Sequence, residues 1–191
     1  MRPGRAGYPI PMLKRAVWEG LVAGAAGMVA MTLTEKVEQR VTGRPSSYVP
    51  ARVLERLLGL PEQSGGRALA LNWAMRHGQG VVVGVVRSVM AEAGLRGLGA
   101  SAHHLVIRLT NDQVLENATG VGAPPRTWPR DELVVDVLHK GVYALATGLV
   151  ADALAARHGP GPGQRHAATR PGRHADVGPV SRRLAYARRH G

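Results

Sequence analysis

The amino-acid sequence predicts an all-α protein: a transmembrane four-helix bundle with a short amphipathic connector helix and disordered basic tails. Three observations lead to this prediction. Four long segments carry apolar residues at helical spacing, two of them contain long uncharged stretches, and the positive charge of the chain gathers at its ends. Glycine and alanine recur in the same segments, and such small residues allow helices to approach each other closely.

The two ends of the chain carry most of its net charge of +12. Residues 1–15 hold four basic residues and no acid, and residues 157–191 hold eight arginines and one acid. Both regions are also rich in proline and glycine, a composition that cannot build a core. We therefore expect a basic irregular leader over residues 1–15, a helical bundle over 16–157 and a disordered tail over 158–191.

The first bundle segment, residues 16–42, contains no charged residue from Gly20 to Thr34. Its small residues fall on one side of a helix, and its larger aliphatic residues fall on the other. A membrane span needs roughly 20 residues, so the segment is long enough if Glu19 faces inward or lies at the interface. A buried helix of a soluble protein is the alternative interpretation.

Residues 50–60 form the predicted connector helix. Its leucines recur at helical spacing, so it would lie on a membrane surface or cap the bundle. The second bundle segment, residues 68–93, has a polar stripe that includes Arg76 and Arg87, opposite a stripe of valines. Its glycines and β-branched residues are poor helix formers in water but ordinary in membrane helices.

The third bundle segment, residues 101–117, is the least apolar of the four, because Arg108 and Asp112 lie on it. Its hydropathy alone does not indicate a membrane span. The fourth segment, residues 131–157, begins with two acids in its first turn, as the helix dipole favours, and is uncharged from 141 to 151.

A membrane bundle would turn its aliphatic stripes to lipid and its polar stripes inward. On the fourth segment Asp136, His139, Lys140 and Tyr143 share one helix face, so we expect this face to point into the bundle. Asp152 falls on the opposite side of the same helix, near its end. The candidate polar interior comprises eight residues: Glu19, Arg76, Arg108, Asp112, Asp136, His139, Lys140 and Tyr143.

The spacing of Asp136 and His139 is that of carboxylate–histidine metal ligands in helical bundles. Such a site also needs matching ligands from other helices, and an internal salt bridge from Asp136 to Lys140 is the simpler interpretation. The sequence therefore predicts no metal, no cofactor and no catalytic residue. The loose candidates for the missing ligands are Glu35, Glu38 and His104.

Residues 16–156 resemble the small four-helix membrane proteins of bacteria, of the YagU-like kind. The resemblance implies a fold and a location in the bacterial cell membrane, and it transfers no biochemical activity. The features that carry it are Trp18-Glu19-Gly20 with Gly24 and Gly27, the pair Gly80 and Gly84, Pro124-Pro125 with Trp128, and His139-Lys140-Gly141-Val142-Tyr143-Ala144 with Thr147-Gly148.

The function that these observations predict is that of a small integral membrane protein with a polar interior, serving transport, proton handling or a partner protein. The excess of basic residues on the side of the termini favours cytoplasmic termini. Membrane lipid is the expected partner, a protein partner or homo-oligomer is left open, and nucleic acid is not expected. Two alternatives remain: a soluble or peripheral helical module that binds anionic polymers through basic tails, and a bundle metalloprotein.

Overall fold

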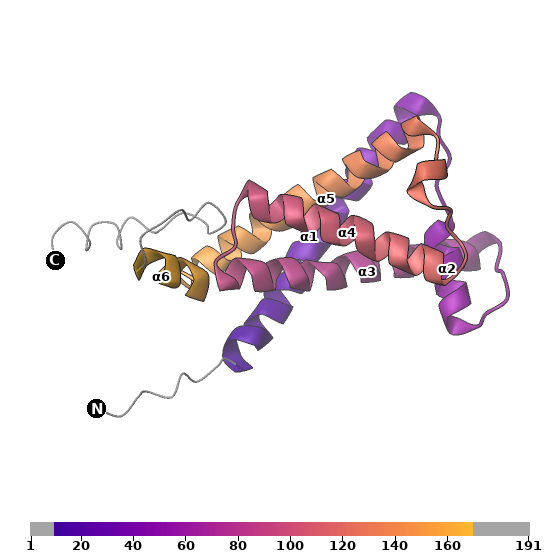
Figure 1. Cartoon of the computed structure of the whole chain (residues 1–191). Helices are drawn as coiled ribbons and strands as arrows, with labels where there is room; N and C mark the ends of the chain where they lie inside the picture. The colour runs from indigo at the N-terminus through magenta and orange to yellow at the C-terminus, as the bar shows by residue number, and fades with distance from the viewer. Residues whose placement is uncertain (1–9, 170–191) are drawn as a thin grey trace.

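The fold is all-α throughout the part of the chain that the computed structural model describes, residues 10–169, as the sequence predicts (Figure 1). Every regular element in this part is a helix. In chain order these are α1 (Ile10–Thr42), α2 (Val49–Leu58), α3 (Gly65–Ala93), α4 (Leu98–Ala118), the short 3-10 turn η1 (Pro125–Thr127), α5 (Arg130–Ala156) and α6 (Pro162–Thr169).

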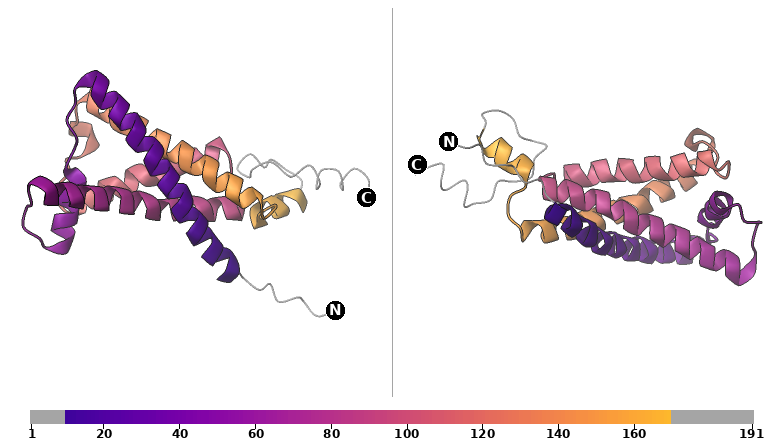
Figure 2. Two further views of the ribbon diagram at one scale, coloured as in Figure 1. Left: turned by 180° about the vertical axis from the view of Figure 1, so that it is seen from behind. Right: turned by 90° about the horizontal axis from the view of Figure 1, so that it is seen from below.

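The four long helices form two pairs that cross each other (Figures 1 and 2). α1 and α5 lie along one direction, and α3 and α4 lie along the other. α1 packs most extensively on α3 and next on α5, whereas α4 packs more on α5 than on α3. At one end of the bundle the pairs diverge, and α2 and η1 lie at that end. At the other end the start of α1, the turn between α3 and α4, and the end of α5 come together.

Glycines make the crossing of α1 and α3 possible. A Cβ atom placed on Gly84 would lie 2.5 Å from the Cα atom of Gly24 and 2.5 Å from the carbonyl oxygen of Gly20. A Cβ atom on Gly24 would lie 2.7 Å from the carbonyl oxygen of Val81. The two backbones therefore touch, which is the close approach that the small-residue side of the first segment predicts.

The interior of the bundle holds small apolar residues and large polar ones. The buried apolar side chains are mostly alanines, whereas the largest fully buried side chains include Arg87, Tyr143 and His104. Large aliphatic residues point outward instead, for example Leu149 at 71% exposed and Val82 at 62%. This arrangement reverses that of a soluble bundle, in which the aliphatic stripes face the core.

Two helices, Met12–Thr42 within α1 and Arg130–Ala156, are long and apolar enough to cross a membrane, judged by length and composition. α3 and α4 do not meet this criterion. Charged side chains lower the mean hydropathy of α3 and α4, and the bundle interior takes up these side chains. Length and composition therefore indicate two candidate membrane spans among the described helices, α1 and α5.

The ends of the bundle are more ordered than the sequence predicts. α1 begins at Ile10, so the last part of the expected irregular leader is helical. The expected disorder from residue 158 is wrong as far as Thr169, because α6 packs on the end of α3. There Gly161 touches the backbone around Gly94, and Arg96 donates to the Gly159 carbonyl oxygen at 3.0 Å. The rest of the expected leader and tail, residues 1–9 and 170–191, lies outside the described residues.

Replacing Gly84 with alanine should destabilise the bundle by about 1–3 kcal/mol, the usual effect of forcing extra bulk into a packed interface. The matched control is Gly78→Ala on the same helix, where an added Cβ atom has no neighbour within 4 Å. Thermal unfolding of the purified variants in one detergent, followed by tryptophan fluorescence, measures the difference. Equal unfolding temperatures for the two variants would contradict a tight α1–α3 crossing.

Candidate functional site

A polar cavity of about 660 Å³ lies between the diverging ends of the two helix pairs. α1 and α5 wall it on one side and α3 and α4 on the other, and residues 44–50 and 121–129 close its end. We call it the ionic cleft. Its ionisable lining residues are Glu35, Arg44, Arg76, Arg108, Asp112, Glu116, Glu132, Asp136, His139 and Lys140.

Asp112 of α4 is the centre of the hydrogen-bond network in the cleft. Its Oδ1 atom accepts a hydrogen bond from Gln79 Nε2 at 2.7 Å, and its Oδ2 atom lies 3.1 Å from Lys140 Nζ and 3.4 Å from Arg108 Nε. Lys140 also donates to Asp136 Oδ2 at 2.8 Å. Two acids and two bases thus neutralise each other across α4 and α5, with Asp112 and Lys140 both more than nine-tenths buried.

A second ion pair joins α1 to α3 across the cleft. Arg76 binds Glu35 with two parallel hydrogen bonds, one of which joins Nη1 to Oε1 at 2.9 Å. This fork geometry is the strongest form of an arginine–carboxylate contact. Gln39 donates to the same Glu35 oxygen at 3.2 Å. The sequence analysis offered Glu35 as a loose candidate metal ligand, and in the structure it is the buried partner of Arg76.

Tyr143 is fully buried next to Arg108, one of the residues that line the cleft. Its hydroxyl donates to the carbonyl oxygen of Gly80 at 2.5 Å, which joins α5 to α3. The Arg108 guanidinium lies over its ring, 5.2 Å from the centroid, in a cation–π contact. The ring of His104 packs beside it at 5.5 Å between centroids. The ring of Tyr143 therefore stabilises the positive charge of Arg108, which lines the cleft.

α2 closes the cleft at the end where the helix pairs diverge, and buried polar contacts hold it there. The side chain of Asn72 accepts the N–H of Ala51 at 3.1 Å and donates to the carbonyl oxygen of Ser47 at 3.2 Å. Burial raises the pKa of Glu55 on α2, but the backbone N–H of Gln63 and the guanidinium of Arg52 outweigh it, so the net pKa lies below its usual value. The position of α2 is therefore fixed against α3 rather than free to swing.

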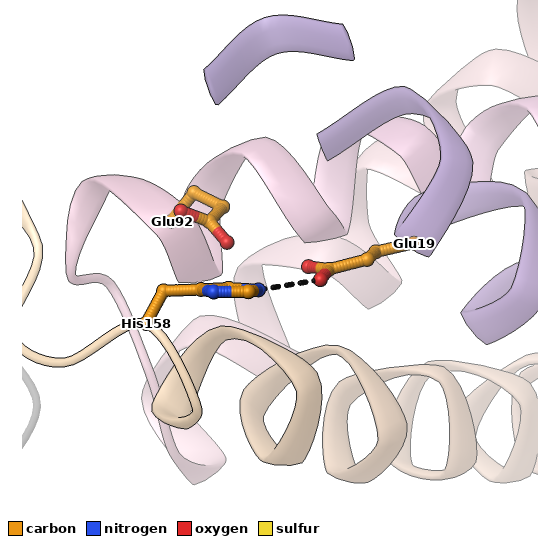
Figure 3. A group of neighbouring side chains, drawn as sticks. All are labelled: Glu19, Glu92 and His158. Atoms are coloured by element: carbon orange, nitrogen blue, oxygen red, sulfur yellow. Dashed lines mark hydrogen bonds and ion pairs between the residues drawn. The ribbon is translucent and has the colours of Figure 1, made fainter. Parts of the chain in front are cut away.

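The eight residues of the predicted polar interior do not all meet. Six of the eight line the ionic cleft: Arg76, Arg108, Asp112, Asp136, His139 and Lys140. Tyr143 is buried against Arg108, next to the cleft. The face of α5 thus points inward, with His139 and Lys140 each 5% exposed. Glu19 lies at the opposite end of the bundle, where it contacts His158 and neighbours Glu92 (Figure 3).

The sequence analysis places Asp152 on the side of α5 opposite the polar face, and the structure gives it a buried partner there. Its Oδ1 atom lies 2.8 Å from Nη2 of Arg87, a guanidinium with no exposed surface, and its Oδ2 atom accepts the Gly97 N–H at 2.8 Å. Because α5 crosses the α3–α4 pair, a different side of the helix meets α3 near its end. Asp152 is therefore a structural partner of Arg87.

Comparison with known proteins adds no functional information: no protein-family model, curated protein or solved structure matches the chain. The likeness to YagU-like membrane proteins therefore stays a prediction.

The chemistry of the cleft suits binding better than bond-breaking. The described lining offers paired acids and bases, with His139 more than nine-tenths buried. The cavity volume falls within the range of small-molecule sites, roughly 300–1,000 Å³. Charges of both signs surround it, so it is suited to a small solute that itself carries both charges or strong dipoles.

Asp112→Asn should destabilise the protein by about 3–5 kcal/mol, because it leaves the buried charges of Lys140 and Arg108 short of a partner. Asp131→Asn is the control: Asp131 is exposed in the first turn of α5, where its loss should cost only about 0.3–1 kcal/mol. Thermal unfolding of both variants in the same detergent gives the comparison. Similar unfolding temperatures would show that the network around Asp112 contributes little.

Proposed function

We propose that the protein is a small integral membrane protein in which α1, α3, α4 and α5 cross the bilayer and enclose a solute-binding cleft. The observation that carries this proposal is the character of the outer faces. In four long stretches of the described helices, every Asp, Glu, Lys and Arg side chain is buried or half-buried. These stretches are residues 17–33, 68–93, 98–118 and 133–156.

The charged residues within these stretches support the same arrangement, because they point inward and are paired. Arg76 binds Glu35, Arg87 binds Asp152, and Lys140 binds two acids. A charged side chain at mid-bilayer costs about 2.5–3.5 kcal/mol on insertion scales, unless it is paired or hydrated. A soluble bundle has no such constraint and places its charges on the outside.

The small buried share of the two most apolar helices also argues against a soluble core. In the most apolar 18-residue stretch of α1, 39% of the residues are buried inside the bundle. In the corresponding stretch of α5, 33% of the residues are buried. A core helix of a soluble protein is mostly buried. Over half of each apolar stretch therefore faces outward, and lipid is the environment in which that surface is stable.

Four crossings place both ends of the described chain on one side of the membrane, together with the turn between α3 and α4 (Figure 2). The other side carries α2, η1 and the closed end of the ionic cleft. Basic residues are more numerous on the side of the termini, which favours cytoplasmic termini. The exposed leucines of α2, Leu57 and Leu58, suit contact with the membrane surface on the far side.

Within this class we assign the ionic cleft to the binding of a small zwitterionic or strongly polar solute, as in a transport or accessory protein. The low-dielectric surroundings strengthen every electrostatic contact inside the cleft. The paired lining keeps the empty cleft stable, and a solute with both charges can take the place of one partner in each pair. No substrate is named by these contacts beyond its charge pattern.

The membrane proposal can be tested by cysteine labelling, since the chain contains no native cysteine. Val82→Cys and Leu149→Cys lie on the outer faces, and Ser64→Cys lies in the exposed segment before α3. In permeabilised cells a water-soluble maleimide should label Ser64→Cys at least tenfold faster than the other two. Labelling in denaturant should equalise all three, and equal rates in the native protein would contradict the proposal.

The solute proposal can be tested by thermal unfolding in the presence of a panel of amino acids and betaines at millimolar concentration. A ligand at 100 times its Kd should stabilise the native protein by about 2.7 kcal/mol. The stabilisation should disappear in Glu35→Gln, which removes one charge from the wall of the cleft, and persist in Glu62→Gln, whose side chain is 72% exposed. Absence of any stabilising member of the panel would count against a zwitterion site.

A further inference from the structure

A second cluster of ionisable residues lies at the end of the bundle opposite the ionic cleft. Glu19 comes from α1, Glu92 from α3 and His158 from the segment just after α5 (Figure 3). One ligand atom from each residue lies within 4.8 Å of the other two. We propose that these three residues form a binding site for one divalent transition-metal ion, of which Zn²⁺ is the best fit.

Glu19 supplies an independent observation in favour of a ligand. Its residue surface is 9% exposed, and its Oε1 atom lies 2.7 Å from His158 Nε2. Its other oxygen, Oε2, is buried and has no hydrogen-bond partner among the described residues. A buried carboxylate oxygen without a partner is costly, and a cation in the space between the three side chains would satisfy it. Figure 3 shows both carboxylates and the edge of the imidazole turned toward this space.

The donor set and its spacing fit zinc after a small adjustment. Zinc binds imidazole nitrogen and carboxylate oxygen at about 2.0–2.2 Å, which places tetrahedral ligand atoms about 3.3 Å apart. The 2.7 Å contact between Glu19 and His158 must widen slightly, and the longest separation in the cluster, which is at most 4.8 Å, must shorten by up to about 1.5 Å. Rotation of the Glu92 side chain can supply this change without movement of the helices. Three protein ligands leave one position for water.

Arg15 is the present partner of Glu92, and it competes with a metal rather than completing the site. Its guanidinium donates to both Glu92 oxygens, from Nη2 at 2.8 Å and from Nε at 3.3 Å. The Arg15 side chain is 37% exposed, so it can turn toward solvent when a cation arrives. His158 is the most exposed of the three ligands, with 31% of its side chain open, and it provides a path for the ion.

A metal here would join three segments that are far apart in the sequence. α1 and α3 already touch at their glycines, and the bound ion would add the end of α5 to this contact. The site would therefore act as a clamp on the end of the bundle that carries both termini of the described chain. This inference does not depend on the proposed solute cleft, which lies at the opposite end.

The test uses the full-length protein carrying a histidine-free affinity tag, stripped with a chelator and then equilibrated with Zn²⁺. After gel filtration, elemental analysis should find one zinc per chain in the native protein. Glu19→Gln and His158→Gln should each lower the zinc content at least tenfold at the same free zinc concentration. The controls Glu62→Gln and His166→Gln, which alter exposed residues of the same types, should retain it.

Arg15→Gln separates a metal site from a simple network of ion pairs. If the cluster binds zinc, removing the competing guanidinium should tighten zinc binding several-fold, and zinc should raise the unfolding temperature of this variant. If the cluster is only an ion-pair network, Arg15→Gln lowers stability and zinc has no effect. His158→Gln alters the most exposed ligand, so it keeps the test valid should Glu19→Gln fail to fold. No stoichiometric zinc, or zinc retained by both ligand variants, overturns the proposal.

Discussion

Charged side chains that are sealed between apolar helices need counter-charges from neighbouring helices, and the packing of this bundle depends on that requirement. Three of the contacts between the long helices carry such a pair. Glu35 and Arg76 join α1 to α3, Asp112 and Lys140 join α4 to α5, and Arg87 and Asp152 join α3 to α5. A shift of any helix by one residue would separate a pair and strand both charges, at several kcal/mol each.

The glycines decide where the helices can cross, and the ion pairs decide how they are rotated. Contact between the backbones at Gly24 and Gly84 leaves no room for side chains at the crossing. The helix pairs must then diverge on one side of that point, and the ionic cleft occupies the space that this divergence opens. A cleft with a charged lining is thus a direct result of a tight crossing between small residues.

Periodicity in the sequence predicts the helices and the inward face of α5 well, because both depend on residues close together in the chain. Periodicity does not predict the position of a residue along the bundle axis, and the sequence analysis therefore grouped Glu19 with residues that lie at the opposite end. The crossing angle is also absent from a helical-wheel argument, which therefore does not predict that Asp152 meets Arg87. Composition alone assigned α6 to disorder, since its docking depends on the fit of Gly161 against the turn after α3. For the same reason the sequence analysis assigned His158 to the disordered tail and did not predict its contact with Glu19.

The long separation in sequence between Arg87 and Asp152 has a consequence for biosynthesis. In a membrane-embedded chain α3 leaves the ribosome well before α5, so Arg87 is made before Asp152, its acidic partner among the described residues. Arg76 has no such difficulty, because Glu35 precedes it in the chain. A nascent α3 that entered lipid alone would carry one uncompensated guanidinium. In the proposed membrane arrangement, the second half of the protein would therefore enter the bilayer together with α3, as a unit, instead of helix by helix.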